Sequence, residues 1–437
     1  MKKVVKFGGS SLADANQFRK VAAIIKADPA RAYVVPSAPG KRFSGDEKVT
    51  DLLIRTHAAV QNKQDWAPIL DRIKERYRSI QTELGLKNDL SKEFYDIEEH
   101  LRVGCSVNYM ASRGEFLNGI LLAEFLGFEF MDAADLVAFT DEGVYDSEKT
   151  LRVMRQALEN KQNVVIPGFY GSKPDGSIKT FSRGGSDITG AIVAQAVHAD
   201  LYENWTDVSG FLMCDPRIVD NPKPIHTITY RELRELSYMG ATVLHAEAIF
   251  PVREAGIPIN IRNTNDPAAP GTMIVPHAGA EPDGDIVTGI AGTKGFVIIR
   301  IEKDMMNQEI GFGYRVLQVL SDRGMSFEHF PSGIDTMCVV LAASEVEGRE
   351  SELLTAISRA VSPDFICMDR GLALIAVVGR GMRDMPGTAS KVFTAVADAG
   401  VNIRMIDQGS SELNIILGVQ EEDFEKTIRS IYSAFYG

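Results

Sequence analysis

The sequence is poor in the residues that would place it in several familiar classes of protein. It has only four cysteines and two tryptophans among 437 residues. The cysteines are too far apart for a metal-binding or disulfide pattern, so we expect reduced thiols and a cytoplasmic protein. No apolar run is long enough to span a bilayer, and the apolar segment near the N-terminus stops at Gly8. We therefore expect neither a signal peptide nor a membrane segment.

Positive charge is also scarce. Lysine and arginine total 47 against 59 aspartates and glutamates, which gives a net charge of −12. This balance argues against a nucleic acid or an anionic membrane as partner. Two phosphate-binding signatures are missing as well, because the chain contains neither G-x-x-x-x-G-K-[ST] nor G-x-G-x-x-G. The sequence thus excludes a P-loop enzyme and the usual dinucleotide site. The seven histidines show no ligand spacing, and we expect no protein-bound metal centre.

The chain does contain a long alternation of strand-like and helix-like segments. Its length predicts two or three domains. Strands are expected at 4–7, 33–35, 164–166 and 201–205, and helices at 17–26, 48–59, 66–83, 116–126 and from about 186. This alternation predicts an α/β fold whose mostly parallel sheet is covered by helices on both faces. Ligands bind such sheets at the carboxyl ends of the strands.

Two glycine turns lie at these strand ends. Residues 6–10 read Lys-Phe-Gly-Gly-Ser, and residues 183–187 read Arg-Gly-Gly-Ser-Asp. Glycines let backbone amides approach phosphate oxygens, and a helix N-terminus adds its positive end. The first turn could equally be a plain entry into a helix. Helix capping accounts for Ser186 and Asp187 but not for Arg183, which can bind a carboxylate in a bidentate fashion. These turns together predict a small-molecule kinase.

Two further segments carry weaker signals. Residues 205–210 and 215–217 could hold the ribose or phosphates of a nucleotide, or could simply be turns with capping aspartates. Glu115 is expected in the first turn of the helix at 116–126, where an acidic side chain is usually solvated. It gains a functional meaning only if the substrate carries an ammonium group.

The C-terminal part of the chain contains an internal repeat. A loop rich in Pro, Gly, Asn and Asp at 263–285 predicts a domain junction. Beyond it, residues 306–326 match residues 382–402 with a constant offset of 76 positions. Each copy reads as strand, glycine loop, amphipathic helix, glycine and two strands. Such a unit leaves one sheet face uncovered, so we expect the two copies to pair with each other or across a dimer.

Taken in order, the motifs resemble those of the aspartate kinases over essentially the whole chain. The matching segments are KFGGSS, the Ser37-Ala38 turn, VTDLL, SRGE, Gly168-Phe169, SRGGSD, WTDVSG with DPR, and GATVLH. The resemblance implies a three-layer α/β/α amino-acid-kinase sandwich over 1–285, followed by tandem α+β ACT modules at 297–370 and 371–437. In this family the first module is inserted in the second, which would then include 286–296.

The resemblance also implies an activity and roles for individual residues. The reaction would be phosphoryl transfer from ATP, with Mg²⁺, to the β-carboxylate of L-aspartate, as the first step toward lysine, threonine and methionine. The catalytic residues would be Lys6 and Asp187. The aspartate site would comprise Thr50, Glu115, Phe169, Arg183 and Ser186. The nucleotide site would comprise Lys6, Phe7, Gly8, Gly9, Ser10, Thr206, Asp207 and Arg217.

The ACT modules imply feedback inhibition by an amino acid, with lysine favoured over threonine. Met306, Phe327 and Glu328 would line the effector site, although Glu328 could equally be an ordinary exposed acid. We expect a homodimer through these modules, with a tetramer as the alternative. A further dehydrogenase activity is not expected, because no segment of that size follows the tail.

The chain departs from the family pattern at two positions. Thr242 replaces a lysine that contacts ATP phosphates in many relatives, and Leu212 replaces a tyrosine near the base. Arg217 and Lys223 are the candidate replacements for the missing positive charge. Two alternatives stay open: a kinase of the same fold acting on acetylglutamate, glutamate or carbamate, and a catalytically inactive amino-acid sensor.

Overall fold

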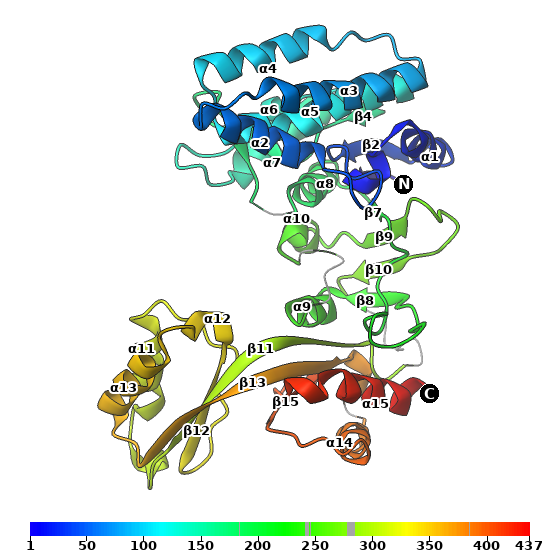
Figure 1. Ribbon diagram of the computed structural model, residues 1–437. Coiled ribbons are helices and arrows are strands. Elements are labelled where there is room, and N and C mark those ends of the chain that lie inside the picture. The colour runs from blue at the N-terminus through cyan, green and yellow to red at the C-terminus, as the bar shows by residue number, and fades with distance from the viewer. Residues whose placement is uncertain (183, 241–243, 245, 278–284, 384) are drawn as a thin grey trace. The chain divides into compact units, whose positions relative to one another are not determined.

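The computed structural model of the protein forms two compact units (Figure 1). It describes residues 1–182, 184–240, 244, 246–277, 285–383 and 385–437. The first unit contains residues 1–211, 224–233 and the described part of 243–278. The second contains the rest of the described residues, so the segments 212–223 and 234–240 group with the C-terminal part. The domain boundaries expected from the sequence stay a prediction.

The first unit is built on one eight-stranded sheet with the order β3-β4-β2-β1-β7-β9-β10-β8. Its strands are β1 (Lys3–Phe7), β2 (Arg31–Pro36), β3 (Glu129–Phe130), β4 (Val164–Val165), β7 (Leu201–Thr206), β8 (Thr227–Thr229), β9 (Ile259–Asn263) and β10 (Thr272–Val275). β1 pairs in parallel with β2 and β7, and β2 pairs in parallel with β4. The carboxyl ends of these four neighbours therefore meet at one edge, as the sequence predicts.

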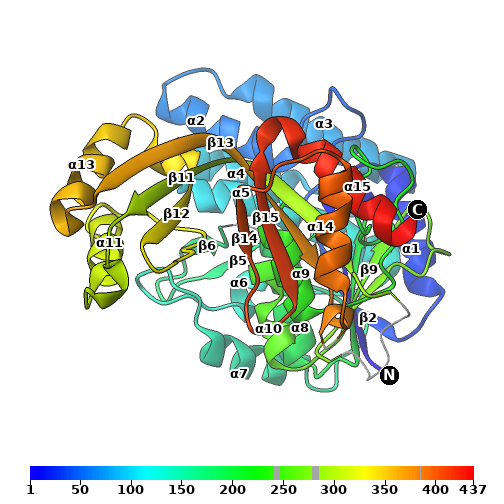
Figure 2. The ribbon, with the colours of Figure 1, turned by 90° about the horizontal axis from the view of Figure 1, so that it is seen from below.

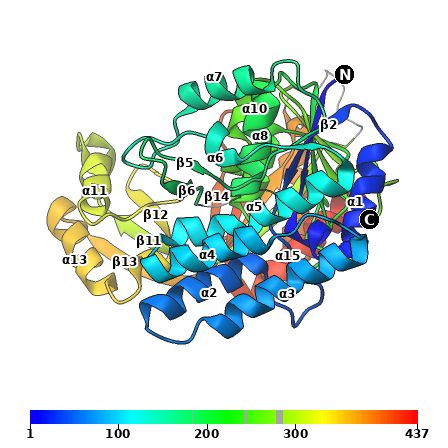
Figure 3. The ribbon, with the colours of Figure 1, turned by 90° about the horizontal axis from the view of Figure 1, so that it is seen from above.

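Helices cover both faces of this sheet, which confirms the predicted three-layer arrangement (Figure 3). They are α1 (Ala15–Lys26), α2 (Val49–Gln61), α3 (Ala67–Leu84), α4 (Ser91–Val103), α5 (Val107–Leu126), α6 (Ala133–Leu136), α7 (Ser147–Leu158), α8 (Gly185–Ala196) and α10 (Phe250–Glu254). A further helix, α9 (Tyr230–Tyr238), begins in the first unit, and its residues from Arg234 onward group with the second. The apolar faces of α1 to α5 pack with Val5 and Phe7 in one core cluster. The opposite face of β1, β2 and β7 is covered by α8. A short hairpin of β5 (Tyr170–Ser172) and β6 (Ile178–Thr180) lies outside the sheet.

Two local predictions in the first unit are wrong. The helix expected at 116–126 begins at Val107, where the Ser106 side chain accepts a hydrogen bond from the backbone N–H of Tyr109 at 3.1 Å. Glu115 therefore lies in mid-helix and not in a first turn. The polar Ser-Arg-Gly stretch, expected before the helix, is part of its buried face. Residues 272–275 of the expected loop at 263–285 form strand β10, because they pair with β9 and β8.

The second unit contains a five-stranded antiparallel sheet with the order β12-β11-β13-β15-β14 (Figure 2). Its strands are β11 (Gly289–Glu302), β12 (Thr336–Ala342), β13 (Phe365–Val378), β14 (Met405–Asp407) and β15 (Asn414–Gln420). Its helices are α11 (Phe312–Ser321), α12 (Ala343–Val346), α13 (Glu350–Val361), α14 (Thr388–Asp398) and α15 (Phe424–Tyr436). α11 packs on α13 and α14 packs on α15, and β11 and β13 run through both halves.

The internal repeat corresponds to two matching halves of this sheet. Gly311 and Gly387 each precede the helix of their copy, with φ of 79° and 91°. These left-handed conformations favour glycine. Val316 and Val392, also 76 residues apart, are fully buried in their respective clusters. The repeat is therefore a repeat of structure, and its two copies share one sheet.

None of the helices in the described part of the chain combines the length and apolar character needed to cross a membrane.

Candidate active site

Lys6 and Asp187 form a largely buried ion pair at the carboxyl edge of the first sheet. Side chains alternate along a strand, so Lys6 lies on the face opposite Val5 and Phe7. That face is covered by α8, which carries Asp187 in its first turn. Lys6 Nζ lies 2.7 Å from Asp187 Oδ1, and the two side chains are 10% and 15% exposed. The first sequence motif and the second are thus brought into direct contact.

Asn204 completes this contact, and the sequence reasoning missed it. It lies on β7 in register with Lys6 of β1. Its amide Nδ2 donates to Asp187 Oδ1 at 2.8 Å. The available signal was a polar amide inside an otherwise mostly apolar strand, at the register position of the lysine.

The glycine turn after β1 is held by backbone contacts on two sides. The N–H of Gly8 donates to the carbonyl of Trp205 at 3.0 Å, and the N–H of Gly40 donates to the carbonyl of Gly9 at 2.8 Å. The two chains cross closely at this point. A Cβ on Gly40 would lie 2.6 Å from the carbonyl carbon of Gly9. Glycine is required at position 40 because there is no space for a Cβ atom. The two hydrogen bonds and this close approach keep the backbone amides of residues 8–10 in a fixed turn.

The loop of residues 36–40 connects this turn to the expected substrate residues. The Pro36 carbonyl accepts from the N–H of Gly168 at 3.1 Å. The Ser37 carbonyl accepts from the Asn118 side chain at 2.6 Å. The loop therefore ties the glycine turn to α5 and to the chain after β4. The sequence marked the Ser37-Ala38 turn as a family motif but gave it no role, because its contacts join distant segments.

Glu115 is a buried carboxyl group on α5, only 5% exposed. Burial raises the pKa of Glu115 to about 8, and the backbone N–H of Ala38 offsets part of this effect. Its Oε2 has no hydrogen-bond partner among the described residues. A buried carboxyl group with an unused oxygen suits a cationic ligand group, because an ammonium would supply the missing partner.

The chain after β4 brings Phe169 and Ser186 together. A Cβ on Gly168 would lie 2.7 Å from Cβ of Ser186, so the two segments touch. Phe169 has a positive φ of 82°, and its N–H donates to Thr189 Oγ1 of α8 at 3.0 Å. Such a conformation is uncommon for a bulky residue and persists only where neighbours enforce it. Thr50 is half-buried in the first turn of α2.

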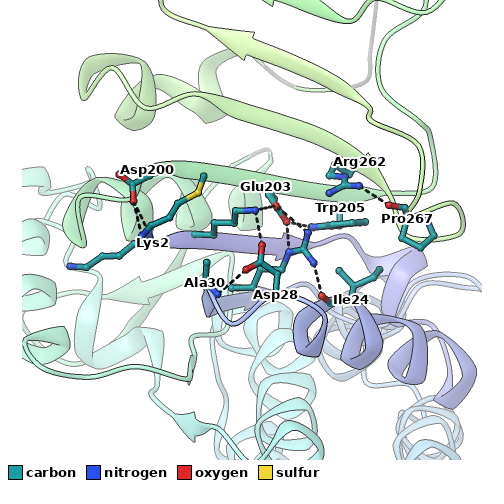
Figure 4. Close-up of polar contacts among 12 residues, drawn as sticks. Lys2, Ile24, Asp28, Ala30, Asp200, Glu203, Trp205, Arg262 and Pro267 are labelled. Atoms are coloured by element: carbon teal, nitrogen blue, oxygen red, sulfur yellow. Dashed lines mark hydrogen bonds and ion pairs between the residues drawn. The ribbon is translucent and has the colours of Figure 1, made fainter.

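A network of charged side chains around Glu203 and Trp205 lies on the other face of the sheet (Figure 4). Glu203 is 1% exposed and pairs with Arg31 at 2.8 Å and with Lys3 at 3.1 Å. It also accepts from the indole N–H of Trp205 at 2.9 Å. The guanidinium of Arg262 lies 4.6 Å from the centre of the same indole ring. These contacts fix Trp205, whose carbonyl holds Gly8.

The remaining predicted site residues are placed as follows. Thr206 and Asp207 follow β7, where the Thr206 hydroxyl donates to Asp207 Oδ1 at 3.1 Å. Arg217 belongs to the second unit, where its exposed guanidinium pairs with Asp215 at 2.6 Å. Leu212 is also in that unit and is 41% exposed. Arg183 and Thr242 lie outside the described residues.

The predicted effector residues lie in the second unit. Met306 is buried in the core of the first ACT-like half, whereas Phe327 is 42% exposed. Glu328 accepts a hydrogen bond from the hydroxyl of Tyr238 on α9. Burial and this carboxylate raise the pKa of Tyr238 to about 12. The next residue, His329, contacts Asp407 of β14 at 2.6 Å. The loop around Glu328 is therefore tied to two other elements of its unit.

The raised pKa of Glu115 predicts a pH-dependent change in stability. The carboxyl group has an ordinary pKa of 4.5 in the unfolded chain and about 8 in the folded protein. Between these values only the folded state keeps the proton, so this group lowers stability as pH rises from about 4.5 to 8. Glu115→Gln removes the effect. Relative to the parent protein, the variant should gain roughly 4 kcal/mol between pH 4 and pH 9.

Denaturant unfolding followed by tryptophan fluorescence measures this directly. The chain has two tryptophans, Trp66 and Trp205, and both lie in the first unit together with Glu115. The signal therefore reports the unit that contains the substitution. A stability difference between variant and parent that is the same at pH 4 and pH 9 would show that the carboxyl group titrates normally.

Comparison with known proteins adds a family context to this geometry. The model of the amino acid kinase family matches residues 1–263, and a model of the ACT domain matches residues 375–435. Aspartokinase 3 of Bacillus subtilis is 40% identical over 450 residues, which cover 99% of this chain and 98% of that protein. The chain spans about half the length of the plant bifunctional aspartokinase/homoserine dehydrogenases that it matches at 27–29% identity.

Solved structures agree over the full chain. The aspartate kinase of Clostridium acetobutylicum superposes with a TM-score of 0.92 at 50% identity, covering 99% of this chain and 100% of that one. Escherichia coli aspartokinase III in complex with aspartate and ADP gives a TM-score of 0.76 at 26% identity, with both chains fully covered. The complex of that protein with lysine and aspartate gives 0.74 at 26% identity, again over both full chains.

Proposed function

Because the chain belongs to the amino acid kinase family and within it to the aspartate kinases, we propose that it transfers the γ-phosphoryl group of ATP to the β-carboxylate of L-aspartate. The product would be 4-phospho-L-aspartate, at the first step toward lysine, threonine and methionine. The observation that carries the proposal is the buried Lys6–Asp187 pair beside the glycine turn, joined through residues 36–40 to Glu115.

The residues divide between the two substrates. The amides of Gly8, Gly9 and Ser10 receive phosphate oxygens, and Lys6 neutralises the charge on the transferring group. Glu115 takes the α-ammonium of aspartate, which supplies the partner that its buried carboxyl group lacks. Thr50, Phe169, Arg183 and Ser186 complete this acceptor site, with Arg183 on the α-carboxylate. Thr206, Asp207 and Arg217 are proposed for the rest of the nucleotide.

The acceptor needs no general base. A β-carboxylate has an ordinary pKa of about 3.9 and is already ionised at neutral pH. The difficulty is to bring an anion to a polyanionic donor, which positioning and positive charge overcome. Mg²⁺ would enter with the nucleotide and neutralise phosphate charge. Asp187, the partly exposed carboxylate beside Lys6, is the fitting oxygen donor to orient it.

The test is ADP formation from ATP, Mg²⁺ and L-aspartate, with the acyl phosphate trapped by hydroxylamine. Acetylglutamate, glutamate and carbamate serve as alternative acceptors. Turnover with aspartate, and with none of the other three acceptors, supports the proposal. Turnover with another acceptor, or lysine binding without any turnover, would replace it by one of the two alternatives that the sequence leaves open.

We further propose feedback inhibition by lysine at the loop that contains Phe327 and Glu328, together with a homodimer through the ACT modules. The lysine-bound structure of the Escherichia coli relative supports an amino-acid effector. An effector ammonium on Glu328 would compete with the Tyr238 hydroxyl that now occupies this carboxylate. Release of Tyr238 would then pass the signal to α9.

This regulation predicts a large loss of lysine sensitivity in Glu328→Gln. A hydrogen bond to a charged group contributes about 1.5–3 kcal/mol, so the half-inhibitory lysine concentration should rise at least about tenfold. Each rate is compared with the uninhibited rate of the same variant. The matched control is Glu345→Gln in α12, which should keep the parent's sensitivity. Equal sensitivity of both variants would place the effector elsewhere.

A further inference from the structure

Asn204 occupies a position between the two charges of the candidate site. It is 4% exposed and lies on β7, in register with Lys6 on the neighbouring parallel strand. Because side chains alternate, both residues lie on the sheet face that α8 covers, and α8 supplies Asp187. The consecutive elements α8 and β7 thus join the distant strand β1 in bringing an amide, an ammonium and a carboxylate to one point.

These three side chains form a closed triangle. Asn204 Nδ2 donates to Asp187 Oδ1 at 2.8 Å, and Lys6 Nζ contacts the same oxygen at 2.7 Å. Lys6 Nζ also donates to Asn204 Oδ1 across a longer distance of 3.5 Å. The charges fix the orientation of the amide, because its NH₂ group faces the carboxylate and its oxygen faces the ammonium. Both ends of the amide are therefore used.

The third side chain of the triangle matters when the ion pair between Lys6 and Asp187 separates. When Lys6 turns toward a phosphoryl oxygen, Oδ1 of Asp187 loses the ammonium that it contacts inside a largely buried site. A buried carboxylate oxygen without a partner is costly. The side-chain amide of Asn204 keeps its hydrogen bond to the same oxygen while Lys6 moves. Before Lys6 moves, this hydrogen bond already stabilises part of the negative charge of Asp187, which weakens the attraction between the carboxylate and Lys6.

We propose that Asn204 is a positioning residue that keeps Asp187 in place while Lys6 shifts its charge to the transferring phosphoryl group. Asn204 itself contacts neither substrate. The proposal rests on the proposed phosphoryl transfer, and it adds a residue that none of the sequence motifs assigned.

The test is Asn204→Leu, which keeps the side-chain size and removes both hydrogen bonds. We expect kcat to fall about tenfold to a hundredfold, because the lysine is no longer aligned. KM for aspartate should stay within about twofold of the parent value, since Asn204 does not touch that substrate. The matched control is Asn260→Leu on the neighbouring strand β9, whose side chain lies on the other face of the sheet. It should keep the parent's kcat.

A second background separates positioning from a general structural role. In Asp187→Asn the carboxylate is already absent, so adding Asn204→Leu should lower kcat no further. A merely structural residue would lower kcat by the same factor in both backgrounds. Tryptophan fluorescence checks folding through the adjacent Trp205. If Asn204→Leu fails to fold, Asn204→Ser replaces it with the same criteria.

The outcomes distinguish the two proposals. A parent protein with no aspartate-dependent turnover would overturn the proposed function and this inference with it. An active parent with an equally active Asn204→Leu would overturn this inference alone. An active parent, a low kcat in the variant and no further loss in the Asp187→Asn background would establish it.

Discussion

Replacing Lys6 by methionine is expected to lower aspartate-dependent ADP formation about a thousandfold or more. Methionine keeps the unbranched side chain as far as Cε but removes the charge that faces the transferring phosphoryl group. Preorganised charge in a water-poor site is usually the largest single contribution to catalysis, and Lys6 is 8% exposed. Loss of one uncharged donor alone typically reduces kcat about a hundredfold to a thousandfold. The measurement is a coupled ADP assay at saturating ATP and aspartate.

The matched control for this variant is Lys2→Met, the same change at an exposed position just before β1. It should retain the parent's kcat. Asp187 keeps the Asn204 amide as partner in Lys6→Met, so the variant is expected to fold, which tryptophan fluorescence can verify. A well-folded Lys6→Met with a rate within tenfold of the parent would show that another cation performs the charge neutralisation.

Gly40→Ala is expected to reduce kcat/KM for ATP about a hundredfold. The added Cβ would lie 2.6–2.8 Å from the backbone of Gly9 and Ser10, and no rotation of a side chain can relieve a clash with backbone. The glycine turn must therefore shift, and misplacement by about 1 Å is enough for a loss of this size. Steady-state kinetics with varied ATP measures the effect.

Gly45→Ala is the matched control, because it lies in the same connection between β2 and α2. Its nearest neighbour would be the Phe43 ring at 3.8 Å, which is ordinary contact. Neither glycine has a left-handed φ, so the pair compares space alone. We expect kcat/KM for ATP within twofold of the parent in Gly45→Ala. Similar values of kcat/KM for ATP in the two variants would mean that ATP use does not depend on the close approach of Gly40 to Gly9.

The mostly parallel character of the sheet and the helices α1, α2, α3 and α8 could be predicted because their signals are local. The apolar face of α1 repeats with helical spacing, and Asp14 caps it by accepting from the N–H of Gln17. The buried strands β1 and β2 are short apolar runs that end in glycine or proline turns. The contact between Lys6 and Asp187 was expected from the family resemblance, which joined two motifs that local patterns cannot connect.

The features that were missed depend on contacts between distant segments. Asn204 has a role only because β7 lies beside β1, and Gly40 only because its chain crosses Gly9. The local pattern placed Glu115 in the first turn of a helix that starts near 116, and only the family resemblance assigned it to the aspartate site. The Glu115 side chain is buried by packing on other segments of the chain. This burial raises the pKa of its carboxyl group from 4.5 to about 8.

The most direct test of the account is the chemical identity of the product formed from ATP, Mg²⁺ and L-aspartate. Aspartate kinase activity requires one ADP per aspartyl hydroxamate after trapping with hydroxylamine, no product without aspartate, and loss of both signals in Lys6→Met. ADP formation that does not depend on aspartate, or a hydroxamate that persists undiminished in Lys6→Met, would contradict it.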